Sequence, residues 1–125
     1  MKLIFPTVIH QIEVKKFKSI KNELIKFVYD QQEKDSTGVT FSNLGGWQSQ
    51  PVYNRDDNIM MKTISDNLLF YFRQNVLQMD NEITIESLWI NINNKGDQNV
   101  LHDHPLSHMA GVFWIKTPKD CGHLE

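Results

Sequence analysis

The sequence is organised around one polar stretch and the apolar run that follows it: Asn99-Val100-Leu101-His102-Asp103-His104-Pro105 and Gly111-Val112-Phe113-Trp114-Ile115. Four of the five histidines of the protein lie between His102 and His123. Residues two apart on an extended backbone project to the same side, roughly 7 Å apart, so His102 and His104 can converge on one metal ion while Asp103 points away. Pro105 cannot donate to a ladder, which places the pair at the end or the edge of a strand.

This pair of imidazoles predicts a metal site at the rim of a sheet. Imidazole binds iron, zinc, copper and nickel, so the pair alone does not choose the metal. The same spacing also fits a polar strand face that is exposed to water, and that alternative stays open at this point.

Length and composition predict one ordinary globular domain spanning residues 1–125. The chain has 125 residues, of which 40% are hydrophobic and 22% are charged. Its net charge of −2 and the lack of like-charge blocks argue against nucleic acid or an anionic membrane as the main partner. The single cysteine, Cys121, excludes an intrachain disulfide, and no apolar run approaches the length of a membrane span. We therefore expect a cytoplasmic protein.

Two segments show the three- and four-residue apolar spacing of amphipathic helices. In residues 17–32 the apolar positions alternate with lysines and glutamates. In residues 60–77 a broad apolar stripe follows Asp56-Asp57-Asn58, whose side chains are acceptors suited to an N-cap. We expect both helices to cover a sheet.

Three segments are rich in β-branched and aromatic residues and predict strands: residues 3–14, 82–93 and 111–117. Between the helices, residues 42–51 form a polar stretch with Gly45-Gly46 and Trp47, which fits either a site-lining loop or a plain connector anchored by one aromatic. Residues 93–97 and 118–122 have the composition of turns. We expect a further strand to begin at His123, with three of its residues in this sequence.

The 82–93 strand has two distinct faces. Leu88, Ile90 and Ile92 form an apolar face that should pack inward, while Trp89 and Asn91 share the opposite face. An amide on such a face needs a partner if it is buried, so Asn91 is a candidate hydrogen-bonding group for a cosubstrate or substrate. Trp89 and Trp47 could wall a cavity, although packing in the core explains either of them equally well.

Several short motifs follow one another over the last two thirds of the chain: Asn43-x-Gly45-Gly46-Trp47-Gln48-Ser49, Trp89-Ile90-Asn91, Asn99-x-x-His102-x-His104-Pro105, Ser107, Gly111-Val112-Phe113-Trp114-Ile115-Lys116, Pro118 and Gly122-x-Leu124. In this order and spacing they resemble the 2-oxoglutarate- and Fe(II)-dependent oxygenases found in bacteria and phages. The resemblance implies a mainly β fold with some helix, a double-stranded β-helix or jelly roll, with two helices covering one side. It also implies Fe(II) and 2-oxoglutarate as cofactors.

Carried onto this chain, the resemblance places His102 and His104 at the first-strand metal motif. From their shared strand face, we expect Asn91 and Trp89 to be the cofactor-binding residues. The common form of that motif in the wider superfamily is His-x-Asp or His-x-Glu, and this chain has His104 in the second place. Members continue past Gly122-x-Leu124 into strands that carry a distal histidine and the basic residue that holds 2-oxoglutarate. We therefore expect residues 1–125 to be the front portion of a longer jelly-roll oxygenase, incomplete at its C-terminal end.

The function that this implies is an Fe(II)- and 2-oxoglutarate-dependent dioxygenase of the hydroxylase type, acting on a small molecule or a peptide. The third ligand could be Asp103, His108 or His123, or could lie beyond Glu125, and Arg73 and Lys116 are weak candidates for the cation that holds 2-oxoglutarate. We expect the 125 residues alone to be inactive. Two alternatives stay open: a non-enzymatic β-sandwich accessory module of a phage or bacterium, and a cupin-like metal protein that does not use 2-oxoglutarate.

Overall fold

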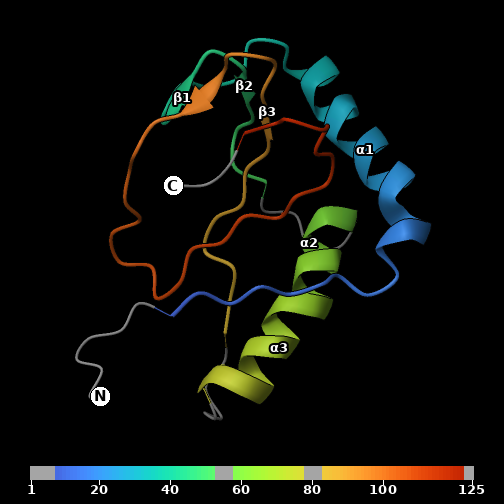
Figure 1. Cartoon of the computed structure of the whole chain (residues 1–125), viewed down its shortest axis with the longest axis vertical. Helices are drawn as coiled ribbons and strands as arrows, with labels where there is room; N and C mark the ends of the chain where they lie inside the picture. Colours follow the sequence, from blue (N-terminus) through green and yellow to red (C-terminus); the bar gives the residue numbers. More distant parts are fainter. Residues whose placement is uncertain (1–7, 53–57, 78–82, 123–125) are drawn as a thin grey trace.

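A computed structural model describes residues 8–52, 58–77 and 83–122. Figure 1 shows the short strands gathered at one end of the molecule, the longest helix along one side, and the second helical rod below the strands. The elements are, in chain order, α1 (Phe17–Lys34), β1 (Asn43–Leu44), β2 (Trp47–Gln48), α2 (Ile59–Ile64), the π-helical stretch η1 (Ser65–Leu69), α3 (Phe70–Phe72), the π-helical stretch η2 (Arg73–Leu77), β3 (Asn91–Ile92) and β4 (Gln98–Asn99). No helix in the described ranges combines the length and the apolar character that crossing a membrane requires.

The predicted helix over residues 17–32 is confirmed as α1. Its apolar stripe faces inward, and Leu24 at its centre is completely buried. Phe17, Ile20 and Phe27 lie on the same stripe and pack against the core. The lysines on the other face stay in water, so α1 covers the structure on one side only, as an amphipathic helix should.

The predicted helix over residues 60–77 is also confirmed, and it begins at the expected cap. The side-chain oxygen of Asn58 accepts hydrogen bonds from the backbone N–H groups of Met60 and Met61, at 3.0 and 3.2 Å. The rod then continues through α2, η1, α3 and η2 without leaving helical backbone angles at the junctions.

The two π-helical stretches of this rod share a local cause that the apolar spacing does not reveal. Asn67 in η1 donates from its side-chain amide to the carbonyl of Thr63, at 2.9 Å, and Asn75 in η2 donates in the same way to Tyr71, at 3.0 Å. In an α-helix each of these carbonyls would accept from the backbone N–H of that asparagine. The side-chain amide competes for the carbonyl, which favours the wider hydrogen-bonding pattern.

The strands form one long antiparallel ribbon, defined here as residues 42–52 paired with residues 88–100. β1 pairs with β4 (Asn43 with Asn99, Leu44 with Gln98) and β2 pairs with β3 (Trp47 with Ile92, Gln48 with Asn91). Backbone hydrogen bonds extend the pairing at both ends, from Ser49 to Ile90 (2.9 Å), from Val52 to Leu88 (2.7 Å) and from Val100 to Ser42 (2.7 Å).

The ribbon is interrupted where Gly45 and Gly46 face the turn formed by residues 93–97. Both glycines have positive φ, +74° and +65°. A Cβ on Gly45 would overlap the carboxylate of Asp97, and one on Gly46 would lie 2.6 Å from the amide oxygen of Asn93 and 2.8 Å from the Ile92 carbonyl. Both positions therefore favour glycine for their backbone angles, and Gly46 also for its close approach to the Ile92 carbonyl.

The core lies between the two helical elements and the inner face of the ribbon. Its buried centre consists of Leu24, Trp47, Met60 and Ile90. Phe113 and Ile115 pack against this centre from the last part of the chain, while Val112 and Trp114, which alternate with them, are exposed. Residues 112–115 thus alternate between solvent and the core, although they form no ladder within the described residues.

Several predicted strands are wrong in extent because a strand also needs a hydrogen-bonded neighbour. Residues 8–14 and 111–117 form no ladder within the described part of the chain, and of residues 83–93 only β3 is a regular strand. Residues 3–7 and the strand expected from His123 lie outside the described residues. The regular strands of the described residues form two antiparallel pairs, and each strand is two residues long. The jelly roll therefore stays a prediction.

Candidate metal centre

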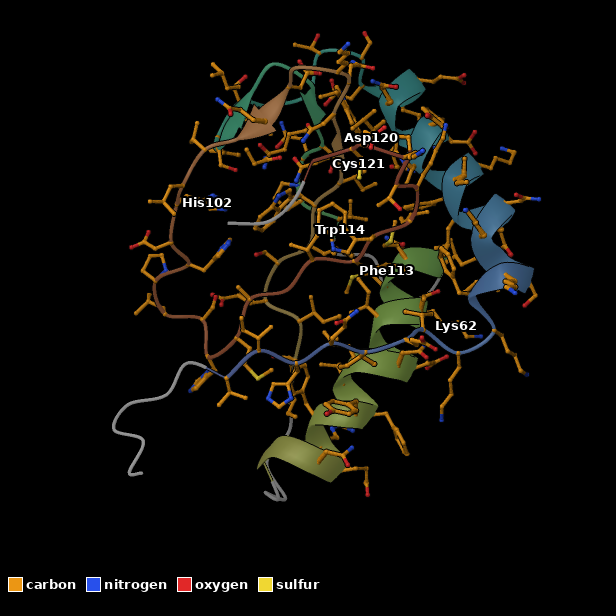
Figure 2. The ribbon with its side chains drawn as sticks, viewed as in Figure 1. Lys62, His102, Phe113, Trp114, Asp120 and Cys121 are labelled. Carbon is orange, nitrogen blue, oxygen red and sulfur yellow. The ribbon has the colours of Figure 1, made fainter. Side chains whose placement is uncertain are left out.

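The histidine pair lies on the loop that follows β4, defined here as the histidine loop, residues 101–107. The hydrogen bond from Val100 to Ser42 is the last rung of the ribbon, after which the chain leaves the ladder. It then turns at Pro105 and Leu106, where Leu106 has a φ of +72° and Ser107 donates to the His104 carbonyl at 3.2 Å. Figure 2 shows His102 on this loop at the left of the molecule, away from α1.

The two imidazole rings lie next to each other. Their centroids are 4.8 Å apart and their planes are inclined by 72°, so one ring meets the other edge to face. His102 is exposed and His104 is half-buried. The intervening Asp103 is exposed.

The orientation of His102 is set by the backbone. Its Nδ1 lies 2.8 Å from the carbonyl oxygen of Val100. A carbonyl can only accept a hydrogen bond, so Nδ1 carries the hydrogen and, in the neutral ring, Nε2 keeps its lone pair. This is the tautomer that metal-binding histidines adopt when a carbonyl holds their other nitrogen.

The orientation of His104 is set by Trp89 on the outer face of the ribbon. The two rings are stacked, with centroids 5.6 Å apart and planes inclined by 30°. A second contact ties the same two segments together, since the Ser107 hydroxyl donates to the Glu86 carboxylate at 3.3 Å. The histidine loop therefore folds back over residues 86–89, and the ring of the half-buried Trp89 lies against His104.

The described residues supply no third ligand to this pair. Within residues 8–52, 58–77 and 83–122, no group of three or more histidine, cysteine, aspartate or glutamate side chains is arranged to hold a metal ion. His108 is exposed and His123 lies outside the described residues. The role of His102 and His104 as metal ligands stays a prediction.

The other predicted site residues are distributed differently. Asn91 is exposed on the outer face of the ribbon, directly across from Gln48. Trp47 belongs to the buried centre of the core, and its indole N–H donates to the Asp35 carbonyl at 2.8 Å. Of the two readings of Trp47, core packing is therefore the one that the structure supports.

The two candidate cations are engaged elsewhere. The guanidinium of Arg73 donates to the carbonyl of Ile83, at 3.4 Å. The ammonium of Lys116 lies 3.4 Å from the hydroxyl of Tyr29 on α1 and 5.6 Å from the centre of that ring. Neither interaction places a positive charge beside the imidazoles.

Gln48 is a residue of this region that the sequence did not identify as a candidate. Gln48 lies in β2, retains only 3% of its surface exposed, and has an amide oxygen without a hydrogen-bond partner in the described part of the chain. The signal in the sequence is weak: a glutamine between Trp47 and Ser49 in a short polar stretch. Its burial depends on how the ribbon is covered.

The comparisons with known proteins concern the same part of the molecule. Residues 87–125 match the model of a protein family described as "Putative 2OG-Fe(II) oxygenase". The matched range contains Trp89, Asn91, His102 and His104. No curated protein and no solved structure matches the chain. The match supports the 2-oxoglutarate- and Fe(II)-dependent oxygenase family, with Fe(II) and 2-oxoglutarate as its cofactors.

Proposed function

We propose that these residues belong to an Fe(II)- and 2-oxoglutarate-dependent dioxygenase of the hydroxylase type, in which His102 and His104 are two of the iron ligands. One observation carries the proposal: within the matched residues 87–125, the two imidazole rings lie 4.8 Å apart, and one of them is held by its Nδ1. The substrate would be a small molecule or a peptide.

The donor set fits iron in part. Non-haem iron oxygenases use two imidazoles and one carboxylate and leave the other positions open. The pair supplies two neutral imidazole donors, and the Val100 carbonyl directs Nε2 of His102 outward. A complete centre needs one more protein ligand, which the described residues do not contribute. We therefore expect weak Fe(II) binding and no turnover from the 125 residues by themselves.

The bound iron and 2-oxoglutarate would supply the activation of O2 for oxidation of a substrate C–H bond, coupled to loss of CO2 from the ketoacid. The residues of this chain would orient the iron ligands and enclose the site. The Val100 carbonyl would keep His102 in one tautomer. The stacked Trp89 would hold the His104 ring in its orientation and exclude water from the stacked face of that ring. The amide of Asn91, on the same outer face as Trp89, would offer a hydrogen bond to 2-oxoglutarate or the substrate.

The fold that we propose is a jelly roll in which this ribbon is one part of the larger sheet. Three features support it: the strands are antiparallel, both helical elements pack on one side of the ribbon, and the histidine pair follows the end of a strand. Confinement to the cytoplasm and an origin in bacteria or phages are parts of the same proposal.

The experiment that tests the proposal is anaerobic calorimetric titration of the metal-free chain with Fe(II), with and without 2-oxoglutarate. His102→Ala and His104→Ala should each weaken Fe(II) binding at least tenfold, about 1.4 kcal/mol, because each removes a ligand. Asp103→Ala and His108→Ala are matched controls in or next to the same loop and should leave the affinity unchanged.

The outcomes separate the alternatives. Fe(II) binding that survives loss of either histidine, or that disappears in Asp103→Ala, would contradict the assigned ligands. Fe(II) binding that 2-oxoglutarate does not strengthen would favour the cupin-like metal protein. No Fe(II)-dependent heat and no rise in melting temperature would favour the non-enzymatic accessory module.

A further inference from the structure

The further inference concerns Gln48, the buried glutamine of β2. Its side chain is 3% exposed, and within the described part of the chain its Oε1 is a buried oxygen with no hydrogen-bond partner. A buried amide oxygen without a partner is destabilising, because the water that it loses on burial is not replaced. Such an atom needs an explanation, and one explanation is a partner that arrives with a ligand.

The register of the ribbon decides which face Gln48 occupies. Trp47 beside it belongs to the core, so Gln48 leaves the strand on the opposite, outer face. Asn91 is its direct cross-strand partner in β3. The backbone pairing continues from Ser49 to Ile90, so Trp89, two residues before Asn91, lies on this outer face as well.

This outer face is also the face that the histidine loop covers. Trp89 stacks on His104, and His104 adjoins His102. The amide of Gln48 therefore belongs to the same side of the ribbon as Trp89, on which His104 stacks. Its direct cross-strand neighbour, Asn91, lies two residues after Trp89 in the chain.

The chemistry of the unpartnered atom indicates what it would bind. An amide oxygen only accepts hydrogen bonds, so its partner must be an N–H or O–H donor. The two carboxylates and the keto group of 2-oxoglutarate are all acceptors at neutral pH, so the cosubstrate cannot satisfy Oε1. Of the two molecules that the proposed site would admit, the substrate is therefore the one that can supply the donor.

We propose that Gln48 is a substrate-recognition residue, whose Oε1 accepts a hydrogen bond from an amide N–H or a hydroxyl of the substrate. This rests on the proposed function for the identity of the reaction, but the binding that it predicts does not require iron. Substrates that carry such a donor near the reacting carbon would be held, and analogues in which the donor is methylated would be rejected.

The test uses the side-chain amide resonance of Gln48 in the metal-free 125-residue chain, assigned through its loss in Gln48→Met. The probes are N-methylacetamide and 2-propanol, which have a donor, and their counterparts N,N-dimethylacetamide and 2-methoxypropane, which have none. We expect the resonance to shift with N-methylacetamide, with 2-propanol or with both, and not with the two counterparts. The responding probe then tells an amide substrate from a hydroxyl one.

The melting temperature of the ligand-free variants gives a second, independent measurement. Gln48→Met removes the unpartnered oxygen at similar volume, so it should raise the melting temperature, whereas an amide with a purely structural role would make the same change lower it. Gln50→Met, an exposed glutamine two residues along, is the matched control and should change little.

Equal shifts with donor and counterpart probes, no shift with any probe, or a lower melting temperature for Gln48→Met would overturn the inference. Its failure is distinguishable from failure of the proposed function, because Fe(II) and 2-oxoglutarate binding is measured separately. Gln48→Met should bind Fe(II) and 2-oxoglutarate as the original chain does.

Discussion

In the core, Leu24, Trp47 and Ile90 are packed between the helices and the inner face of the ribbon, whereas Leu101 in the histidine loop has 98% of its surface in solvent. Leu106 in the same loop is 94% exposed. The first region is held by apolar contacts in every direction, and the second by a few hydrogen bonds and one ring stack. The part of the chain that stabilises the fold is thus distinct from the part that carries the candidate chemistry.

This separation follows the general division between packed elements and loops. Apolar burial is the main stabilising term in folding, while binding groups are commonly presented on loops that a rigid scaffold positions. Trp89 belongs to both regions, because its segment is paired in the ribbon and its ring supports His104. Changes in the core should therefore alter stability, and changes in the loop should alter binding.

The largest expected difference between the regions comes from the same substitution made in each. Leu24→Ala should lower the free energy of unfolding by about 2–5 kcal/mol, because it leaves a cavity at a completely buried position. Leu101→Ala should change it by less than about 0.5 kcal/mol, since that side chain is already in water. Urea unfolding of both variants measures the two values, and equal losses would mean that the histidine loop is packed in solution.

A smaller difference is expected from adding a methyl group to a glycine of the ribbon and to a glycine that follows the histidine loop. Gly46→Ala should destabilise by about 1–3 kcal/mol, because φ is +65° there and the new Cβ would meet Asn93 and the Ile92 carbonyl. Gly111→Ala, next to open space, should be close to neutral. Thermal unfolding of both variants is the measurement, and a neutral Gly46→Ala would show that the close approach of the 93–97 turn is absent.

The smallest effect should come from charge on the surface of α1. Asp30 accepts a hydrogen bond from Lys26, and this bond raises the pKa of Lys26 above its ordinary value of 10.5. A raised pKa in the folded state contributes stability that is present below pH 10.5 and is lost as the pH rises through the folded value. Because the pair is solvent-exposed, the contribution should be slight.

Comparing the melting temperature of Asp30→Asn with that of the original chain from pH 7 to above pH 10.5 checks this, since the lysine keeps its charge at the lower end of that range and loses it above 10.5. The difference in melting temperature should be small throughout and should disappear as the pH rises above 10.5. A difference in melting temperature as large as that caused by Gly46→Ala, or one that grows with pH, would contradict the expected small contribution of this pair.

Sequence reasoning succeeded where the relevant contacts are local. The apolar spacing of residues 17–32 and 60–77 predicted both helices, and Asp56-Asp57-Asn58 was predicted to supply the N-cap of the second, because these patterns depend on residues within one or two turns. It failed for the strands of residues 8–14 and 111–117, because alternation describes which side of a segment is buried and not whether another backbone lies beside it.

In the candidate site too, the local features were predicted and the long-range contacts were not. The spacing of His102 and His104 marked the place, and their rings are neighbours in the structure. The stack of Trp89 on His104 and the unpartnered oxygen of Gln48 were not predictable, since both depend on a ribbon whose two halves are far apart in the sequence: the bond from Ile90 to Ser49 alone spans 41 residues.

The sequence by itself therefore determined the two helices, the cap at Asn58 and the closely spaced pair of imidazoles, since each depends on residues within a few positions of one another. Only the tertiary structure decided that Gly45 and Gly46 oppose a five-residue turn, that Trp47 lies in the core while Trp89 supports the histidine, and that Gln48 is buried. The physical reason is that pairing between distant strands sets the register, and the register decides which face each side chain occupies.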